Sequence, residues 1–116
     1  MNLEELVFFL SQKRAVSESF PFDEDTLVFK VGGKMFALIA LERFPRAINL
    51  KCDPERSLEL RESYSGITPG YHMSKKHWNT VYLEDVPQDL LKELIDHSYD
   101  LVVAKMTKKE RTELGF

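Results

Sequence analysis

The apolar positions at the start of the chain repeat with the period of an α-helix. They recur at spacings of three and four residues, which places them on one side of a helix. Asn2 and Glu5 have the spacing of a capping box, in which each side chain accepts from the backbone N–H of the other residue. We therefore predict a helix over residues 2–12. Its apolar stripe consists of Leu3, Leu6, Val7 and Leu10.

Residues 26–41 have the pattern of a β-hairpin, with two apolar segments on either side of Gly32 and Gly33. A Gly-Gly loop provides the positive φ angles that a type I′ turn needs. The second segment is apolar at both alternations, which predicts a central strand. A third strand is expected at 47–52. Before the hairpin, Phe20 and Phe22 are expected to anchor the connection on the core.

The second half of the chain predicts a helix, a hairpin and two further helices. Asp53 and Pro54 suit the start of a helix that runs to about residue 64, with Gly66 in a left-handed conformation beyond it. A second hairpin is expected at about 70–74 and 77–83. An apolar stripe that starts near Pro87 predicts a long helix, and a capping box at Thr107 and Glu110 predicts a short one after it.

The predicted order is α-β-β-β-α-β-β-α. Adjacent strands joined by short turns favour antiparallel pairing, and the helices are not interleaved one per strand. We expect an α+β fold of two layers, with a five-stranded antiparallel sheet and the helices on one face. The chain has 116 residues, of which 43% are hydrophobic, so a single domain over 1–116 with a substantial core is expected.

The cysteine content and the N-terminal segment narrow the class of protein. Cys52 is the only cysteine, which excludes an intramolecular disulfide and a multi-cysteine zinc site. The first residues lack the basic start of a signal peptide, and no apolar run approaches the ~20 residues of a membrane span. We expect a cytoplasmic protein with no membrane partner.

Charge is distributed unevenly along the chain, whose net charge is -3. Residues 1–27 hold six acidic and two basic residues, and residues 83–116 hold eight acidic and five basic ones. Residues 28–82, in contrast, hold nine basic and five acidic residues. Two interpretations are open: a basic face for an anionic partner, or charges scattered on a solvated surface.

Residues 71–79 form the densest cluster of polar and aromatic side chains. Lysines contact phosphates, an asparagine can recognise a base edge and aromatic rings can stack on bases. Alternatively, Tyr71 and Trp78 belong to the sheet, and the lysines only solubilise a turn. The candidate nucleic-acid contacts are Lys75, Lys76, His77, Trp78 and Asn79, together with Lys51 and Arg46 from the basic segment.

Metal or catalytic chemistry finds little support in the residue pattern. His72 and His77 are the two histidines of the cluster, and no carboxylate lies among them, whereas a metal site needs three or four ligands. Cys52 follows a predicted strand and precedes a helix, but no family-specific nucleophile motif surrounds it. We predict no metal, no cofactor and no catalytic residue.

The chain resembles the MmcQ/YjbR family of small bacterial proteins, and residues 69–81 (PGYHMSKKHWNTV) are the most specific match. The resemblance implies a CyaY-like, or double-wing, α+β fold and carries a DNA-binding label, with candidate contacts at residues 75–79. It also implies a topology like that of secretion chaperones. The other matching stretches are 20–22, 26–36, 49–54, 60–62, 98–99 and 101–102.

Two functions are consistent with these observations. The first is a non-enzymatic DNA-binding protein whose binding is weak and salt-sensitive. The second is a protein-binding or small-ligand-binding module, present as a monomer or a weak homodimer. The first requires that the basic residues share one face: Lys30, Lys34, Arg43, Arg46, Lys51, Lys75 and Lys76.

Overall fold

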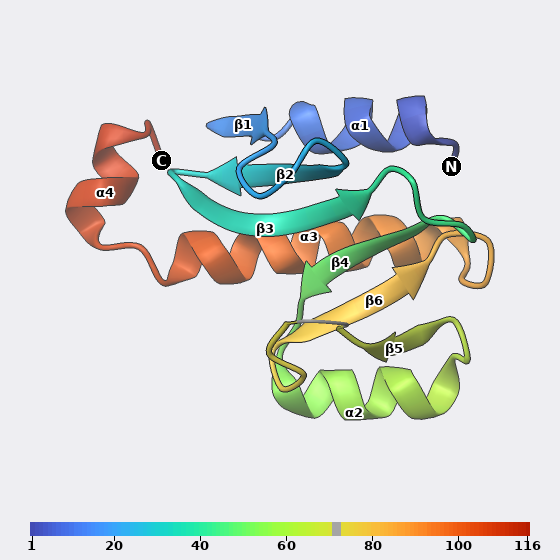
Figure 1. Cartoon of the computed structure of the whole chain (residues 1–116). Helices are drawn as coiled ribbons and strands as arrows, with labels where there is room; N and C mark the ends of the chain where they lie inside the picture. The colour runs from blue at the N-terminus through green and yellow to red at the C-terminus, as the bar shows by residue number, and fades with distance from the viewer. Residues whose placement is uncertain (71–72) are drawn as a thin grey trace.

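The computed structural model describes residues 1–70 and 73–116, and in these residues it contains four helices and six strands (Figure 1). The helices are α1 (Leu3–Ser11), α2 (Pro54–Ser63), α3 (Gln88–Ala104) and α4 (Lys108–Glu113). The strands are β1 (Val16–Ser19), β2 (Thr26–Val31), β3 (Lys34–Ala40), β4 (Ala47–Lys51), β5 (Ile67–Pro69) and β6 (Trp78–Tyr82).

Every predicted helix is present, and the predicted caps mark the starts of three of them. Asn2 and Glu5 form the capping box of α1, and Thr107 and Glu110 form that of α4. Asp53 accepts the backbone N–H of Arg56 at the start of α2. The long helix α3 has no side-chain cap, and Pro87 precedes its first residue. The N-terminal signals thus locate three of the four helix starts.

The sheet is antiparallel with the strand order β1-β2-β3-β4-β6-β5, which corrects the prediction of five strands. The predicted element order is also wrong, because four strands precede α2 and two helices follow β6. The additional strand, β1, is polar and mostly exposed, so it lacks the apolar alternation that marks a half-buried strand. It pairs only along one side, with β2, as an edge strand.

The second predicted hairpin has a different first strand. β5 lies at Ile67–Pro69 rather than at 70–74, and residues 73–74 belong to the connection that leads to β6. Residues 71–72 lie outside the described part of the chain. The three residues of β5 include a proline, and their apolar pattern is too weak to predict a strand. The strand is defined by its pairing with β6, in which Ile67 lies opposite Val81.

The sheet has one face covered by helices and one open face. Figure 1 shows α3 running behind the strands, with α1 at one side and α2 at the other. The main core joins buried residues of the sheet, such as Phe29 and Ile48, to Leu6 of α1, Leu60 of α2 and Leu94 of α3. The open face, as we call the other side, has a smaller buried cluster of Val28, Leu38 and Trp78.

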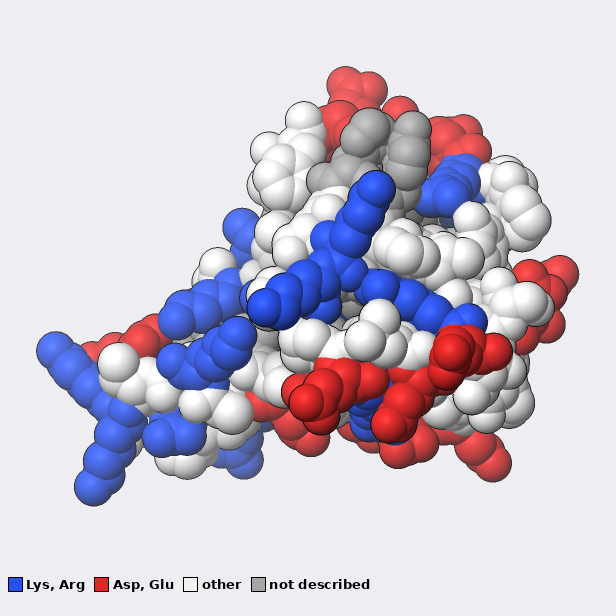
Figure 2. Space-filling view, turned by 90° about the horizontal axis from the view of Figure 1, so that it is seen from below, with Lys and Arg blue, Asp and Glu red and all other residues white. Residues whose placement is uncertain are grey.

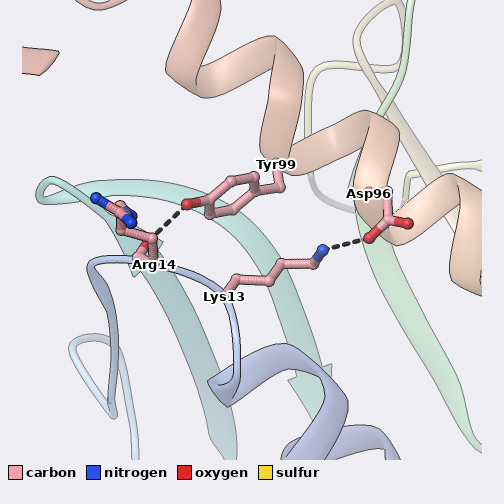
Figure 3. A network of polar contacts seen from close by, with 4 residues as sticks. All are labelled: Lys13, Arg14, Asp96 and Tyr99. Atoms are coloured by element: carbon pink, nitrogen blue, oxygen red, sulfur yellow. Dashed lines mark hydrogen bonds and ion pairs between the residues drawn. The ribbon is translucent and has the colours of Figure 1, made fainter. Parts of the chain in front are cut away.

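A polar network ties the segment after α1 to α3 (Figure 3). Lys13 forms an ion pair with Asp96, and the Tyr99 hydroxyl donates a 2.6 Å hydrogen bond to the carbonyl of Arg14. Tyr99 also packs edge-on against Phe36, with their ring centres 5.4 Å apart. These contacts fix the edge of the sheet relative to the central helix.

Two local predictions about turns and anchors are wrong. Phe20 and Phe22 are 48% and 64% exposed, so neither side chain anchors its connection on the core. Gly66 does not have a positive φ. A Cβ at Gly66 would instead lie 2.5 Å from the Cβ of Asp85, so close packing requires the glycine there. Gly32 and Gly33 do have positive φ, as the predicted turn requires.

Candidate nucleic-acid interface

Lys51 and Trp78 face each other across the ladder between β4 and β6. The Nζ of Lys51 lies 5.5 Å from the centre of the Trp78 ring, within range of a cation–π interaction. Trp78 is only 6% exposed and packs on Val28 and Leu38 of the open face. The indole ring therefore supports the Lys51 ammonium and presents little surface of its own.

Asn79 points to the opposite side of the sheet, because side chains alternate along β6. It is 2% exposed, and its amide donates to the Ser57 hydroxyl (3.2 Å) and accepts from Nε of Arg61 (2.8 Å). Both ends of the amide are thus used by α2. In this structure Asn79 acts as an internal connector and not as a surface group.

Arg61 joins Asn79 to the turn that precedes β6. Its Nη2 donates to the carbonyls of Lys75 and Trp78, the latter over 3.3 Å. The backbone N–H groups of His77 and Trp78 in turn donate to the carbonyl of Ser74. Sequence reasoning did not select Arg61, because nothing in its helical context shows that it reaches a turn beyond β5.

The turn holds Lys75, Lys76 and His77 at the surface, where all three are exposed. The carbonyl of His77 accepts the N–H of Cys52 over 2.9 Å, so the turn lies directly beside the end of β4. The structure therefore brings these three candidates close to Lys51. His72 and Tyr71, the other members of the predicted cluster, lie outside the described residues.

Three lysines from distant parts of the chain lie near one another. Burial, together with the positive charges of Lys105 and Lys34, lowers the pKa of Lys51 below its usual value. Lys51 and Lys105 line a common cavity of about 280 Å³, which also includes Ser74 and His77. We call the surface formed by Lys34, Lys51, Lys75, Lys76 and Lys105 the basic end.

Figure 2 shows Lys and Arg side chains gathered in a diagonal band on this side of the molecule, with acidic side chains along one margin. Lys34 is 3.5 Å from a carboxylate oxygen of Glu110. The other four lysines of the basic end take part in none of the ion pairs between described residues.

Arg46 and Arg43 lie away from the basic end. Arg46 precedes β4, and five residues of extended chain, at about 3.3 Å each, separate it from Lys51 by roughly 16 Å. Its guanidinium donates to the carbonyl of Leu41 (2.6 Å) and lies over the Phe44 ring. Arg43 donates to the hydroxyl of Tyr82. The seven basic residues that the DNA-binding interpretation requires on one face are therefore not all brought together, because Lys51, Lys75 and Lys76 lie at one end of β4 and Arg43 and Arg46 lie at the other.

Cys52 and His97 flank the start of α2. Cys52 is buried, and this burial raises the pKa of its thiol, which favours the unreactive protonated form. Nε2 of His97 accepts the backbone N–H of Asp53 over 3.2 Å. Among residues 1–70 and 73–116, no three His, Cys, Asp or Glu side chains lie close enough to hold a metal ion.

The open face carries a groove of about 750 Å³. Met35, Leu38 and Ala40 of β3 contribute its apolar lining, and Asn49 of β4 is a polar group beside them. The Thr80 hydroxyl donates to Oδ1 of Asn49 over 2.7 Å, which orients the amide. Within the described ranges, no helix is both long and apolar enough to cross a bilayer.

Comparison with known proteins places the whole chain among small bacterial proteins. The family model described as YjbR matches residues 11–101. The chain is 46% identical over 92 residues to the uncharacterized protein YbdF of Escherichia coli O157:H7, covering 78% of this chain and 75% of that protein. It is 30% identical over 112 residues to the uncharacterized protein YjbR of Escherichia coli K12, covering 96% and 95%.

Solved structures have the same fold. The crystal structure of Deinococcus radiodurans protein DR2400, with the family-model domain DUF419, aligns with a TM-score of 0.94 at 46% identity, covering 99% of this chain and 88% of that one. The crystal structure of a Pseudomonas syringae protein aligns with a TM-score of 0.74 at 29% identity, covering 87% and 98%. The architecture described above is therefore shared with these proteins.

Proposed function

Because the chain belongs to the YjbR family, we propose that it is a non-enzymatic, cytoplasmic DNA-binding protein that holds the sugar-phosphate backbone at its basic end. The observation that supports this proposal is one cavity lined by Lys51, at the end of β4, and Lys105, just after α3, while the charge of Lys34 in β3 also acts on Lys51. Like charges repel, so a protein gains stability when an anion lies between them. DNA phosphates are anions of this kind.

The individual candidates have different roles in this proposal. Lys75, Lys76 and His77 are exposed and contact phosphates directly. Trp78 and Asn79 act indirectly: the first supports Lys51, and the second fixes Arg61 and the turn. Arg46 is too far from the basic end to share a phosphate with it, so it contacts DNA only if the duplex extends along the sheet.

Binding is expected to be weak and to depend strongly on salt. The chain has a net charge of -3, so only the local field of the basic end attracts DNA. Three phosphate contacts predict an affinity loss of about 500-fold when the salt concentration rises from about 20 mM to about 200 mM. Contacts to phosphates alone give no preference for a particular DNA sequence.

Fluorescence anisotropy with a labelled duplex at these two salt concentrations tests the proposal. The double variant Lys75→Gln with Lys76→Gln lowers the net charge by two, and we expect it to weaken binding at low salt. The control is Lys92→Glu, which also lowers the net charge by two. Lys92 lies beside Phe9, at the end of α3 that is far from Lys105 and the basic end. Binding that is absent at low salt, or lost equally in both variants, contradicts the proposal.

A second candidate is a module that binds a small ligand or a protein, and the groove on the open face favours it. A volume of about 750 Å³ is within the range of small-molecule sites. Its apolar floor and the oriented Asn49 amide suit a ligand with an apolar body and a carbonyl acceptor. Titration with a fluorescent apolar probe, compared between the natural protein and Met35→Gln, tests this candidate. Light scattering distinguishes a monomer from a weak homodimer.

A further inference from the structure

The cavity at the basic end is a pocket and not a flat patch. Lys51, at the end of β4, and Lys105, which follows α3, line it from two sides. The apolar side chains of Pro54, Leu101 and Trp78 contribute further walls. A volume of about 280 Å³ lies just below the usual range for ligand sites, so the pocket suits a single chemical group.

The polar groups of the pocket are mostly hydrogen-bond donors. Lys51 and Lys105 provide ammonium groups, and Ser74 and His77 add a hydroxyl and an imidazole. One carboxylate, that of Asp53, also lines the pocket, and it accepts the backbone N–H of Arg56. The two ammonium groups, together with the hydroxyl and the imidazole, therefore outnumber the single carboxylate.

We propose that this pocket binds a phosphate monoester, with Lys51 and Lys105 as its cationic contacts. A monoester has one esterified oxygen, so the phosphate can enter a pocket while the rest of its molecule stays outside. A phosphodiester continues in two directions and suits an open surface. A monoester also carries a charge of about -1.5 to -2 at neutral pH, which matches two ammonium groups better than the single charge of a diester.

This inference rests on the proposed function, because it assigns one pocket of the same basic end to a terminal phosphate of a DNA strand. The same chemistry is present in a free nucleotide such as AMP and in inorganic phosphate. Lys75 and Lys76 lie outside the pocket lining and remain the contacts for backbone phosphates. Pocket and surface can therefore be tested separately.

The pocket contains its own optical probe. Trp78 is the only tryptophan of the chain, lines the pocket and lies under Lys51. A bound phosphate that displaces the Lys51 ammonium, or forms an ion pair with it, changes the electrostatic environment of the indole ring. Intrinsic fluorescence therefore reports occupancy without any label on the ligand.

The experiment titrates the full chain at constant ionic strength with inorganic phosphate, with AMP, and with a DNA duplex that carries either a 5′-phosphate or a 5′-hydroxyl. We expect saturable fluorescence changes with phosphate and AMP, and tighter binding of the 5′-phosphorylated duplex. Lys105→Gln is expected to weaken binding of each monoester by about tenfold, the size of one charge-assisted hydrogen bond.

Lys92→Gln is the matched control, since it removes the same charge from α3, far from Lys105, which follows the end of that helix. The two positions are 13 residues apart, or about 20 Å along a helix. Thermal unfolding of both variants verifies that each remains folded, and Lys51→Gln provides a second variant of the pocket. Equal weakening by Lys105→Gln and Lys92→Gln overturns the proposal, because binding then depends only on net charge.

The remaining outcomes separate the pocket from the proposed function. If both duplexes bind equally and neither phosphate nor AMP gives a saturable change, the pocket proposal fails and DNA binding stands. If phosphate and AMP saturate and depend on Lys105 while neither duplex binds, the pocket proposal stands and the proposed function fails.

Discussion

Lys51 and Trp78 are direct neighbours across β4 and β6, with the ammonium 5.5 Å from the ring centre. This pair joins the small apolar cluster of the open face to the basic end. The ring fills space beneath the lysine, so Lys51 is partly desolvated and its pKa is lowered. Packing on the open face therefore controls the position of a charge that the proposed function uses.

Replacing Trp78 by alanine is expected to destabilise the protein by about 3–5 kcal/mol, because a large buried side chain leaves a cavity. Urea unfolding followed by circular dichroism measures this loss, since the variant has no tryptophan to report by fluorescence. Leu58→Ala, at a site 63% exposed, is the control and is expected to change stability by less than about 0.5 kcal/mol. Similar values for the two variants would show that the ring is not structural.

Asn79→Ala is expected to cost about 1–3 kcal/mol and to loosen the turn before β6, because Arg61 loses the acceptor that orients it. Amide hydrogen exchange at His77 and Trp78, whose N–H groups donate within this turn, reports the loosening. Arg61→Lys should accelerate the same amides, since an ammonium cannot reproduce the guanidinium fork. Unchanged exchange in both variants would contradict the connector role of Asn79.

Ser98 is a buried link between α3 and two strands, and its removal is expected to cost about 1–3 kcal/mol. Its hydroxyl donates to the carbonyl of Phe36 (2.6 Å) and accepts the N–H of Lys51 (2.9 Å). Ser98→Ala should therefore destabilise the chain and accelerate exchange at the Lys51 amide. Ser63→Ala, at an exposed site of α2, is the control. Equal stability of the two variants would contradict this role.

Stability is expected to fall as the pH drops below 6.5, the ordinary pKa of histidine, because of His97. Burial, and then the charge of Arg56, lowers the pKa of His97 in the folded state. The unfolded chain thus binds more protons between the folded pKa and 6.5, and folding loses free energy as pH falls through this window.

His97→Gln should flatten this pH dependence, since its amide oxygen can still accept the Asp53 N–H but does not titrate in this range. His77→Gln, at an exposed site, is the matched control and should keep the slope. Unfolding free energies measured at several pH values between about 5 and 7 decide this. A slope that persists in His97→Gln would assign the dependence to other groups.

Much of the fold could be predicted because its signals are local. Each of these signals involves only residues that are close together in the sequence. The two capping boxes, the Asp53 cap and the Gly-Gly turn are all present. Strands β1 and β5 could not be predicted in the same way. They are short edge strands whose stability comes from pairing with β2 and β6, and their own residues carry little apolar pattern.

The arrangement of the candidate residues could be predicted only in part, for a similar reason. The cluster at 75–79 lies beside Lys51: Lys75 and Lys76 belong to the basic end, and His77 lines the cavity next to Lys51. The separation of Arg46 from Lys51 follows from strand length alone. The opposite directions of Trp78 and Asn79 follow from alternation, but which of them faces α2 depends on how β6 pairs with β4.

By itself, the sequence determined the helices, the central hairpin, the family and the basic character of the middle segment, since these depend on neighbouring residues or composition. Only the tertiary structure decided that Lys51 and Lys105 line one small pocket, that the charge of Lys34 acts on Lys51, and that Arg61 reaches the turn. Such contacts join residues far apart along the chain. Their existence depends on sheet register and helix packing, which bring distant charges close enough to interact.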